Sequence, residues 1–140
     1  MAADFDDFNR RLIDDLRANG GRATQAPFQG IDLLVLTTRG ARSGEPRESP
    51  LAYSRDGERL VIVASKAGAP THPAWYHNLV AHPKVTVEVD GEQVPVRASQ
   101  VEDEAEYERL YARHAELVPS FNEYREKTSR RIPVIVLERR

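Results

Sequence analysis

The chain contains no cysteine among its 140 residues. This absence excludes disulfide bonds, thiolate metal ligands and thiol nucleophiles together, and it suits a reducing compartment. No apolar run approaches the roughly 20 residues that a membrane-spanning helix needs. Residues 1–7 are acidic, whereas a signal peptide begins with positive charge. We therefore expect a soluble, cytoplasmic protein without stable membrane insertion.

The chain also lacks an excess of charge of either sign. Its 20 basic and 22 acidic residues give a net charge of −2, so no overall basic field would draw it to nucleic acid. Hydrophobic residues make up 40% and charged residues 30%, which is the composition of a globular protein. This length predicts a single domain over residues 1–140. Any anion site must then come from a local basic cluster.

Apolar periodicity and turn signals predict a mainly β, α+β fold with six short strands and flanking helices. A parallel sheet would need a helix between most strands, so this pattern favours an antiparallel barrel, whose closure hides the sheet edges. The strands are expected at 31–38, 47–55, 60–65, 84–89, 92–99 and 132–137. Helices are expected at 4–18 (within an N-terminal helical segment 1–20), 73–81 and 102–117, with one or two helical turns at 120–127. The periodic face of the helix 4–18 is expected to dock on the domain's own core.

The clearest candidate for a binding site is the loop RGARSGEPR at residues 39–47. It places Arg39, Arg42 and Arg47 on one turn, and guanidinium groups match the oxygens of a phosphate. Glycines in the loop let backbone N–H groups approach the same anion. It is not a P-loop, because the Lys-Ser/Thr ending and the following helix are missing. The alternative is a solvated turn whose arginines pair with Glu45 and Glu48.

Three further segments carry groups that suit a ligand or a reaction. SKAG at residues 65–68 follows a strand and offers donors, or it is an ordinary exit from that strand. In PAWYHNL at 73–79, the alternative is that Trp75 and Leu79 are core and Asn78 ties a loop. Tyr124 would donate a proton or a hydrogen bond to a substrate oxygen, or it would pack on the barrel.

A metal site is not expected. His72, His77 and His82 recur every five residues, whereas one face of a helix needs a spacing of three or four. The histidines therefore do not form the pattern of a zinc site.

In their order along the chain, four segments together resemble the deazaflavin (coenzyme F420)-dependent nitroreductase family of split-barrel oxidoreductases. These segments are LTTRG 36–40 through RESPL 47–51, ASKAG 64–68, PAWYHNL 73–79 with AHP 81–83, and YREKT 124–128 followed by RIPV 131–134. The resemblance covers roughly residues 28–139. It implies a six-stranded antiparallel split barrel, similar to FMN-binding split barrels, that binds F420.

The resemblance also implies the site residues. The basic loop, with Arg39, Arg42, Ser43 and Arg47, corresponds to the family's holder of the cofactor's phosphate and acidic tail. The other positions that match cofactor-binding residues are Pro50, Leu51, Ser65, Lys66, Ala67, Gly68, Pro73, Trp75 and Asn78. Tyr124 matches a tyrosine that faces the substrate and is the expected catalytic residue. The implied reaction is hydride transfer from F420H2 to an electron-poor acceptor such as a quinone, an enone or a nitro compound.

The chain departs from the family pattern at a few positions. Phe121 stands where some nitro-reducing members have tyrosine, which weakens the case for nitroreduction more than the case for cofactor binding. Ala67 replaces a common glycine, and Ala41 replaces a common basic residue. Two alternatives stay open, an FMN-dependent enzyme on the same barrel and a non-catalytic deazaflavin-binding protein. Split barrels of this size often pair, so a homodimer is also among the expectations.

Overall fold

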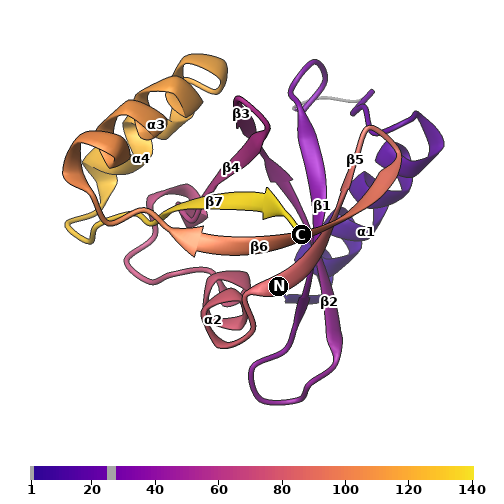
Figure 1. The fold of residues 1–140 in the computed structure, drawn as a ribbon. Coiled ribbons are helices and arrows are strands. Elements are labelled where there is room, and N and C mark those ends of the chain that lie inside the picture. The colour runs from indigo at the N-terminus through magenta and orange to yellow at the C-terminus, as the bar shows by residue number, and fades with distance from the viewer. Residues whose placement is uncertain (1, 25–27) are drawn as a thin grey trace.

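The computed structural model describes residues 2–24 and 28–140, and over these residues it contains seven strands and four helices (Figure 1). The helices are α1 (Ala2–Ala18), α2 (Ala74–Ala81), α3 (Glu104–Leu117) and α4 (Ser120–Lys127). The strands are β1 (Leu33–Arg39), β2 (Pro46–Ala52), β3 (Ser54–Asp56), β4 (Arg59–Val63), β5 (Lys84–Val89), β6 (Glu92–Gln100) and β7 (Val134–Arg139). None of the helices in this described part is both long and apolar enough to cross a bilayer.

The seven strands form one antiparallel sheet in the order β2-β1-β5-β6-β7-β4-β3. β2 and β3 stand at opposite ends of this order, yet only Tyr53 separates them in the chain. The sheet must therefore curl until its two ends meet, which confirms the predicted split barrel. One detail differs from the expectation. The segment 47–55 forms two strands because its pairing changes at Tyr53 from β1 to β4.

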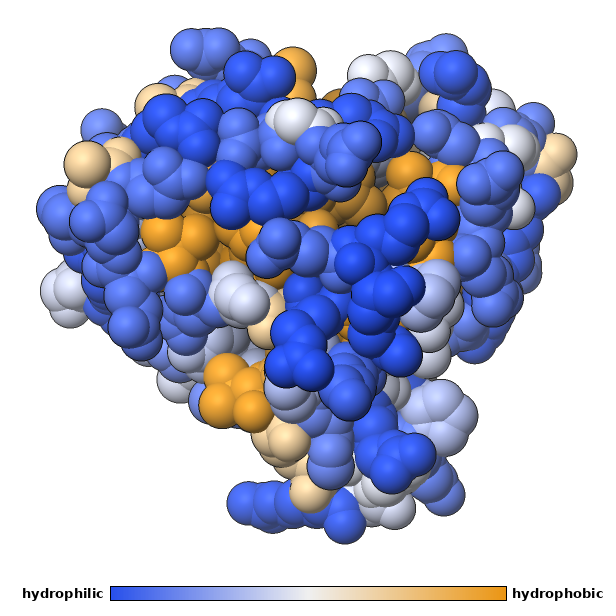
Figure 2. All heavy atoms as spheres, in the orientation of Figure 1, coloured by the Kyte–Doolittle hydropathy of each residue, from blue (hydrophilic) through white to orange (hydrophobic). Residues whose placement is uncertain are grey.

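The alternating direction of strand side chains builds separate cores on the two faces of the sheet. On β1, Leu34 and Leu36 point into the barrel, while Leu33 and Val35 pack against α1. β4 repeats the pattern: Leu60 and Ile62 lie inside the barrel, while its valines at 61 and 63 pack against α3 and α4. Figure 2 shows that hydrophilic residues cover much of the side of the molecule seen in Figure 1, with apolar residues exposed between them.

Helix α1 docks on the outer face of the sheet, as its periodicity predicted. Ile13 and Leu16 are buried there, and the guanidinium of Arg17 pairs with Glu48 on β2 and with Glu88 on β5. Phe8, which lies one turn before Leu12 on the same helix, is instead 42% exposed. The helix is thus fixed along one side while part of its apolar face remains free.

Helix α3 packs its buried tyrosines toward the chain segments that follow it. The Tyr107 hydroxyl donates a 2.6 Å hydrogen bond to Ile132 O, and the Tyr111 hydroxyl donates one of 2.6 Å to Phe121 O. These bonds hold α4 and the approach to β7 in place. Two apolar residues of the helices, Leu117 of α3 and Val80 of α2, are exposed, because each helix turns that side to solvent.

The imidazole of His114 lies inside this α3–α4 packing. Its Nδ1 shares a 3.1 Å hydrogen bond with Ser54 Oγ, and its Nε2 has no partner among the described residues. The ring of Phe121 lies edge-on to it, with the ring centroids 4.4 Å apart. Burial lowers the pKa of His114 from 6.5 to about 4, because the interior disfavours the charged imidazolium.

We expect the free energy of unfolding to fall as pH decreases from 6.5 to 4, since only the unfolded chain binds a proton at His114 in that window. The contribution reaches about 3 kcal/mol at the acid end. His114→Asn removes this titration, so urea unfolding should show a shallower pH dependence for the variant. His82→Asn, at an exposed histidine, should follow the wild type. Equal slopes for His114→Asn and wild type would contradict the assignment.

Candidate functional site

A groove of about 1300 Å³ lies where the barrel wall meets three flanking elements. One side is formed by the loop after β1 and by β2 from Arg47 to Ala52, and the other by the start of α2 and by the Ser65–Ala67 turn. Helices α1 and α4 complete it at the far end. Ligand pockets for drug-sized molecules typically occupy about 300–1,000 Å³, so this groove has room for a long ligand and a second molecule.

One end of the groove is basic. Arg42 and Arg47 line it and are exposed, and within residues 2–24 and 28–140 neither forms an ion pair or a side-chain hydrogen bond. The only carboxylate that lines the described groove is that of Glu48, which is paired with Arg17 and Arg10 of α1. The turn is therefore not neutralised by Glu48, and two guanidinium groups stay free for an anion.

The electrostatics of Glu48 agree with this arrangement. Burial alone would raise the pKa of its carboxyl, but the hydrogen bonds and charges of Arg17 and Arg10 outweigh burial and hold the pKa below its usual range. Glu48 is thus ionised at neutral pH and is occupied by α1. Its negative charge is compensated before any ligand reaches the groove.

The backbone of the basic loop is fixed by internal bonds and by α2. Within the loop, Gly40 N donates to Glu45 O at 2.8 Å and Glu45 N donates to Ser43 Oγ at 3.2 Å. From α2, Asn78 Oδ1 accepts from Ala41 N at 2.9 Å, while its Nδ2 donates to Thr38 Oγ1 at 3.2 Å. Asn78 therefore ties the loop to the barrel, which was one reading of its motif, and it also lines the groove.

The next wall of the groove is a left-handed turn that follows β4. Ser65 has helical dihedrals, and Lys66, Ala67 and Gly68 then have φ values of 47°, 53° and 79°. A right-handed residue followed by a left-handed one directs successive N–H groups toward one point, which makes a concavity for negative charge. Positive φ is costly for residues with a side chain, so surrounding contacts must hold Lys66 and Ala67 in this conformation.

Gly68 has a different role from its neighbours, because it is buried against α4 and does not line the groove. A Cβ at this position would lie 2.9 Å from Lys127 Cβ and 3.0 Å from Tyr124 O. The glycine thus permits the turn to contact the helix that carries Tyr124. This contact couples the positions of two walls of the groove.

Tyr124 is the one tyrosine among the groove-lining residues, and its hydroxyl has no hydrogen-bond partner within the described part of the chain. The hydroxyls of the other four tyrosines are engaged elsewhere: those of Tyr107 and Tyr111 donate to backbone carbonyls, that of Tyr76 donates to Gln100 and that of Tyr53 accepts from Arg55. Tyr124 is therefore the tyrosine placed to donate to a ligand in the groove.

The far end of the groove is apolar, and the sequence motifs did not point to it. Phe8 and Leu12 of α1 meet Phe28 and Ile31 there, with the rings of Phe8 and Phe28 5.9 Å apart between centroids. Phe121 and Val118 extend the same surface from the α4 side. The one sequence feature that could have indicated this apolar end is the helix 4–18. It carries more apolar residues than are needed to dock it on the sheet.

The structure brings most of the predicted site residues together. Those that line the groove are Arg42, Ser43, Arg47, Pro50, Leu51, Ser65, Lys66, Ala67, Pro73, Trp75, Asn78 and Tyr124. Arg39 and Gly68 are not part of the lining: Arg39 is exposed at the end of β1, and Gly68 packs on α4. Trp75 is half-buried; it packs against the barrel core and also lines the groove.

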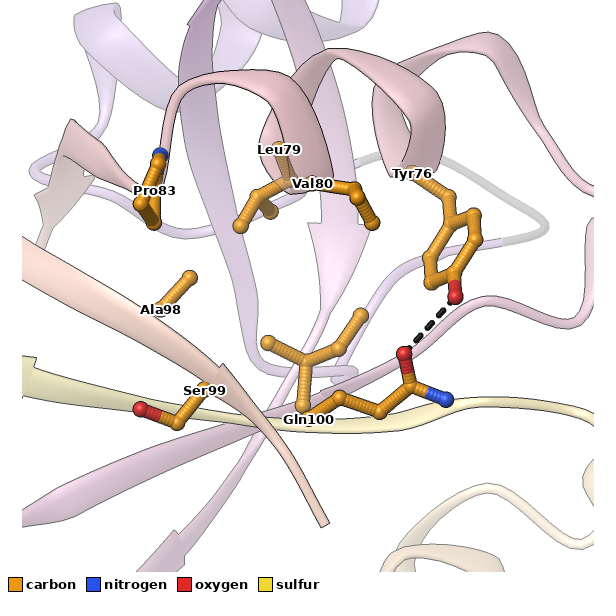
Figure 3. Close-up of a pocket in the computed structure, with 8 residues that line it drawn as sticks. Tyr76, Leu79, Val80, Pro83, Ala98, Ser99 and Gln100 are labelled. Atoms are coloured by element: carbon orange, nitrogen blue, oxygen red, sulfur yellow. Dashed lines mark hydrogen bonds between the residues drawn. The ribbon is translucent and has the colours of Figure 1, made fainter. Parts of the chain in front are cut away.

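A second, smaller cavity of about 210 Å³ lies between α2 and β6 (Figure 3). Leu79, Val80 and Ala98 line it, and the Tyr76 hydroxyl closes one side by donating to Gln100 Oε1 at 2.7 Å. It is smaller than the roughly 300 Å³ of typical ligand sites and contains no charged side chain among the residues described. The groove is thus the better candidate for the functional site.

Comparison with known proteins gives a consistent result. The family described as F420H(2)-dependent quinone reductase matches residues 8–139, a range that contains every residue described as lining the groove. The chain is 43% identical over 112 residues to an F420H(2)-dependent quinone reductase of Mycobacterium tuberculosis (strain H37Rv), covering 76% of this chain and 73% of that relative.

Two solved structures share the fold over most of the chain. One is of an F420-H2-dependent reductase, with a TM-score of 0.70 and 38% identity over 76% of this chain and 93% of that one. The other, described as a domain-swapped dimer, has a TM-score of 0.72 and 32% identity over 94% of this chain and 98% of that one.

Proposed function

Because the chain belongs to the F420H(2)-dependent quinone reductase family, we propose that its groove binds coenzyme F420 and a quinone side by side. The anionic tail of the cofactor lies at the basic end, its ring lies beside the Ser65–Ala67 turn and Trp75, and the quinone enters from the apolar end. The function is thus the two-electron reduction of a quinone by F420H2. The groove, about 1300 Å³ in volume, has room for both molecules.

The observation that carries this proposal is the pair of free guanidinium groups at Arg42 and Arg47. Most arginines elsewhere on the described surface pair with carboxylates, as Arg17, Arg109 and Arg125 do. A phosphate or carboxylate would supply the partner that these two residues lack among the described residues, and arginine can bind such groups with two parallel bonds. The free cations thus fit a cofactor with an anionic tail.

The middle of the groove suits a flat ring. Trp75 and Pro50 offer apolar surface, while the turn offers the N–H groups of Lys66 and Ala67 to ring oxygens where negative charge develops. When bound, the reduced deazaflavin supplies the hydride. The protein's share is to hold two flat molecules in contact at about 3–3.5 Å and to keep water away from their interface.

The far end determines what accepts the hydride. Phe8, Leu12 and Phe28 form an apolar surface that suits a quinone ring and its hydrocarbon substituents. Reduction of a quinone by a hydride leaves negative charge on an oxygen, which needs a proton. The Tyr124 hydroxyl is free to donate to that oxygen and to transfer its proton, with water restoring it afterwards.

Titration with oxidised F420 and with FMN, side by side, tests the cofactor assignment. We expect quenching of F420 fluorescence that saturates in the micromolar range or below, with much weaker binding of FMN. FMN also carries a phosphate that the basic end of the groove would bind. The preference for F420 over FMN must therefore come from the deazaflavin ring of F420 and from its longer anionic tail. Tighter binding of FMN would replace the cofactor in this account, and binding of neither would overturn it.

We also propose that the protein pairs with a second copy and works in the cytoplasm. Support for the pairing comes from a solved relative, 32% identical, that is described as a domain-swapped dimer. Support for the compartment comes from the lack of cysteine in the sequence.

A further inference from the structure

Arg130 lies between α4 and β7 and does not line the groove. Its guanidinium is nevertheless directed at the chain segment that does. Nη2 donates to Ser65 O at 2.6 Å, Nε donates to Ala69 O at 2.8 Å, and Nη1 donates to Ala64 O at 3.2 Å. Nη1 also donates to Nδ1 of His72 at 2.9 Å. One side chain thus fixes both ends of the left-handed turn.

This turn needs such support. Lys66 and Ala67 have positive φ, a conformation that is unfavourable for residues with a side chain. Two backbone bonds close the turn, Gly68 N to Ser65 O at 3.0 Å and Ala69 N to Lys66 O at 3.0 Å. Arg130 binds the carbonyls before and after it, so a relaxed turn would leave a half-buried guanidinium without its acceptors.

The charge of Arg130 is also unusual in its surroundings. Among the described residues it pairs with no carboxylate, and its acceptors are three carbonyls and a neutral imidazole. Burial lowers the pKa of His72, and the charges of Arg130 and His77 lower it further, so the imidazole stays neutral and able to accept. A positive charge therefore lies next to the turn and is not cancelled by an ion pair.

We propose that Arg130 is a positioning residue for the cofactor: its guanidinium holds the Ser65–Gly68 turn in the left-handed conformation in which the turn lines the groove. The expected effect of Arg130 on F420 binding rests on the proposed function. Lysine cannot replace Arg130, because a single ammonium group cannot reach Ala64 O, Ser65 O and Ala69 O in the geometry of the planar fork. The conservative change Arg130→Lys keeps the positive charge but removes the set of hydrogen bonds to the three carbonyls.

The test compares the wild type with Arg130→Lys, Ala67→Gly and the double variant. Hydrogen exchange reports the turn without any ligand, and we expect Arg130→Lys to speed exchange at residues 65–69 while leaving the α3 amides unchanged. Oxidised F420 should bind about tenfold more weakly to Arg130→Lys than to wild type. In the Ala67→Gly background the same change should cost only about threefold, because glycine adopts positive φ with less strain.

Arg131→Lys is the matched control, since Arg131 lies on the surface, pairs with Glu104 at 2.9 Å and stacks on Tyr107. It should leave both exchange at 65–69 and F420 binding unchanged. Unchanged exchange in Arg130→Lys, faster exchange throughout the protein, or an equal loss of affinity in both Ala67 backgrounds would each overturn the proposal. If wild type binds no F420, the proposed function fails, and the exchange data alone then decide whether Arg130 holds the turn.

Discussion

Replacing Arg42 with alanine should weaken the binding of F420 about ten- to a hundredfold while leaving the fold intact. Each charge-assisted hydrogen bond contributes roughly 1.5–3 kcal/mol, and a factor of ten in Kd corresponds to about 1.4 kcal/mol. Arg42 is exposed at the basic end of the groove and supports no contact that the barrel needs. Fluorescence titration gives the affinity, and thermal unfolding checks the fold.

Arg39→Ala is the control for this experiment. Arg39 has the same charge and stands only three positions earlier, but it does not line the groove, so its replacement should weaken binding much less. The difference between the two variants should shrink at high salt, because salt screens exposed charges. Wild-type affinity in Arg42→Ala, or an equal loss in Arg39→Ala, would contradict the placement of the anionic tail.

Replacing Tyr124 with phenylalanine should lower kcat for quinone reduction by about a hundredfold without changing the Kd for oxidised F420. The variant keeps the ring that packs edge-on against Phe121, with centroids 5.1 Å apart, and loses only the hydroxyl. A group that acts as the proton donor typically contributes about 10²–10⁴-fold. Steady-state turnover of F420H2 with a soluble quinone, together with a cofactor titration, separates the two effects.

Tyr76→Phe is the matched control, because it removes the same atom from a tyrosine whose hydroxyl is bonded to Gln100 outside the groove. Its kcat should match that of the wild type. If Tyr124→Phe also turns over like the wild type, Tyr124 is not the proton donor, and water must supply the proton.

Features determined by local sequence were predictable. Alternating apolar residues and the Asp-Gly turns at residues 56–57 and 90–91 indicated the strands and hairpins, and the spacing in residues 102–117 indicated α3. The basic loop was visible because its arginines are close in the chain. The division of the segment 47–55 into two strands was not predictable, since the change of pairing partner at Tyr53 depends on how the sheet closes.

Features that depend on distant residues were missed for the same reason. The alternative in which the loop arginines pair with Glu48 could not be decided from the sequence, because the partners of Glu48, Arg10 and Arg17, lie more than thirty residues earlier. The apolar end of the groove joins Phe8 to Phe121, and the turn at Ser65 is held by Arg130, 65 residues later. No local pattern indicates these pairings, which arise only when the barrel brings the segments together.

The most direct test of the central claim is the anaerobic oxidation of F420H2 by a soluble quinone, with and without the purified protein. The account predicts a protein-dependent rate that saturates with quinone concentration, because the cofactor and the acceptor occupy one groove. The same protein should not accelerate oxidation when the quinone is omitted. Tight binding of F420 without quinone-dependent oxidation would contradict the account and would leave a deazaflavin-binding protein that is not a quinone reductase.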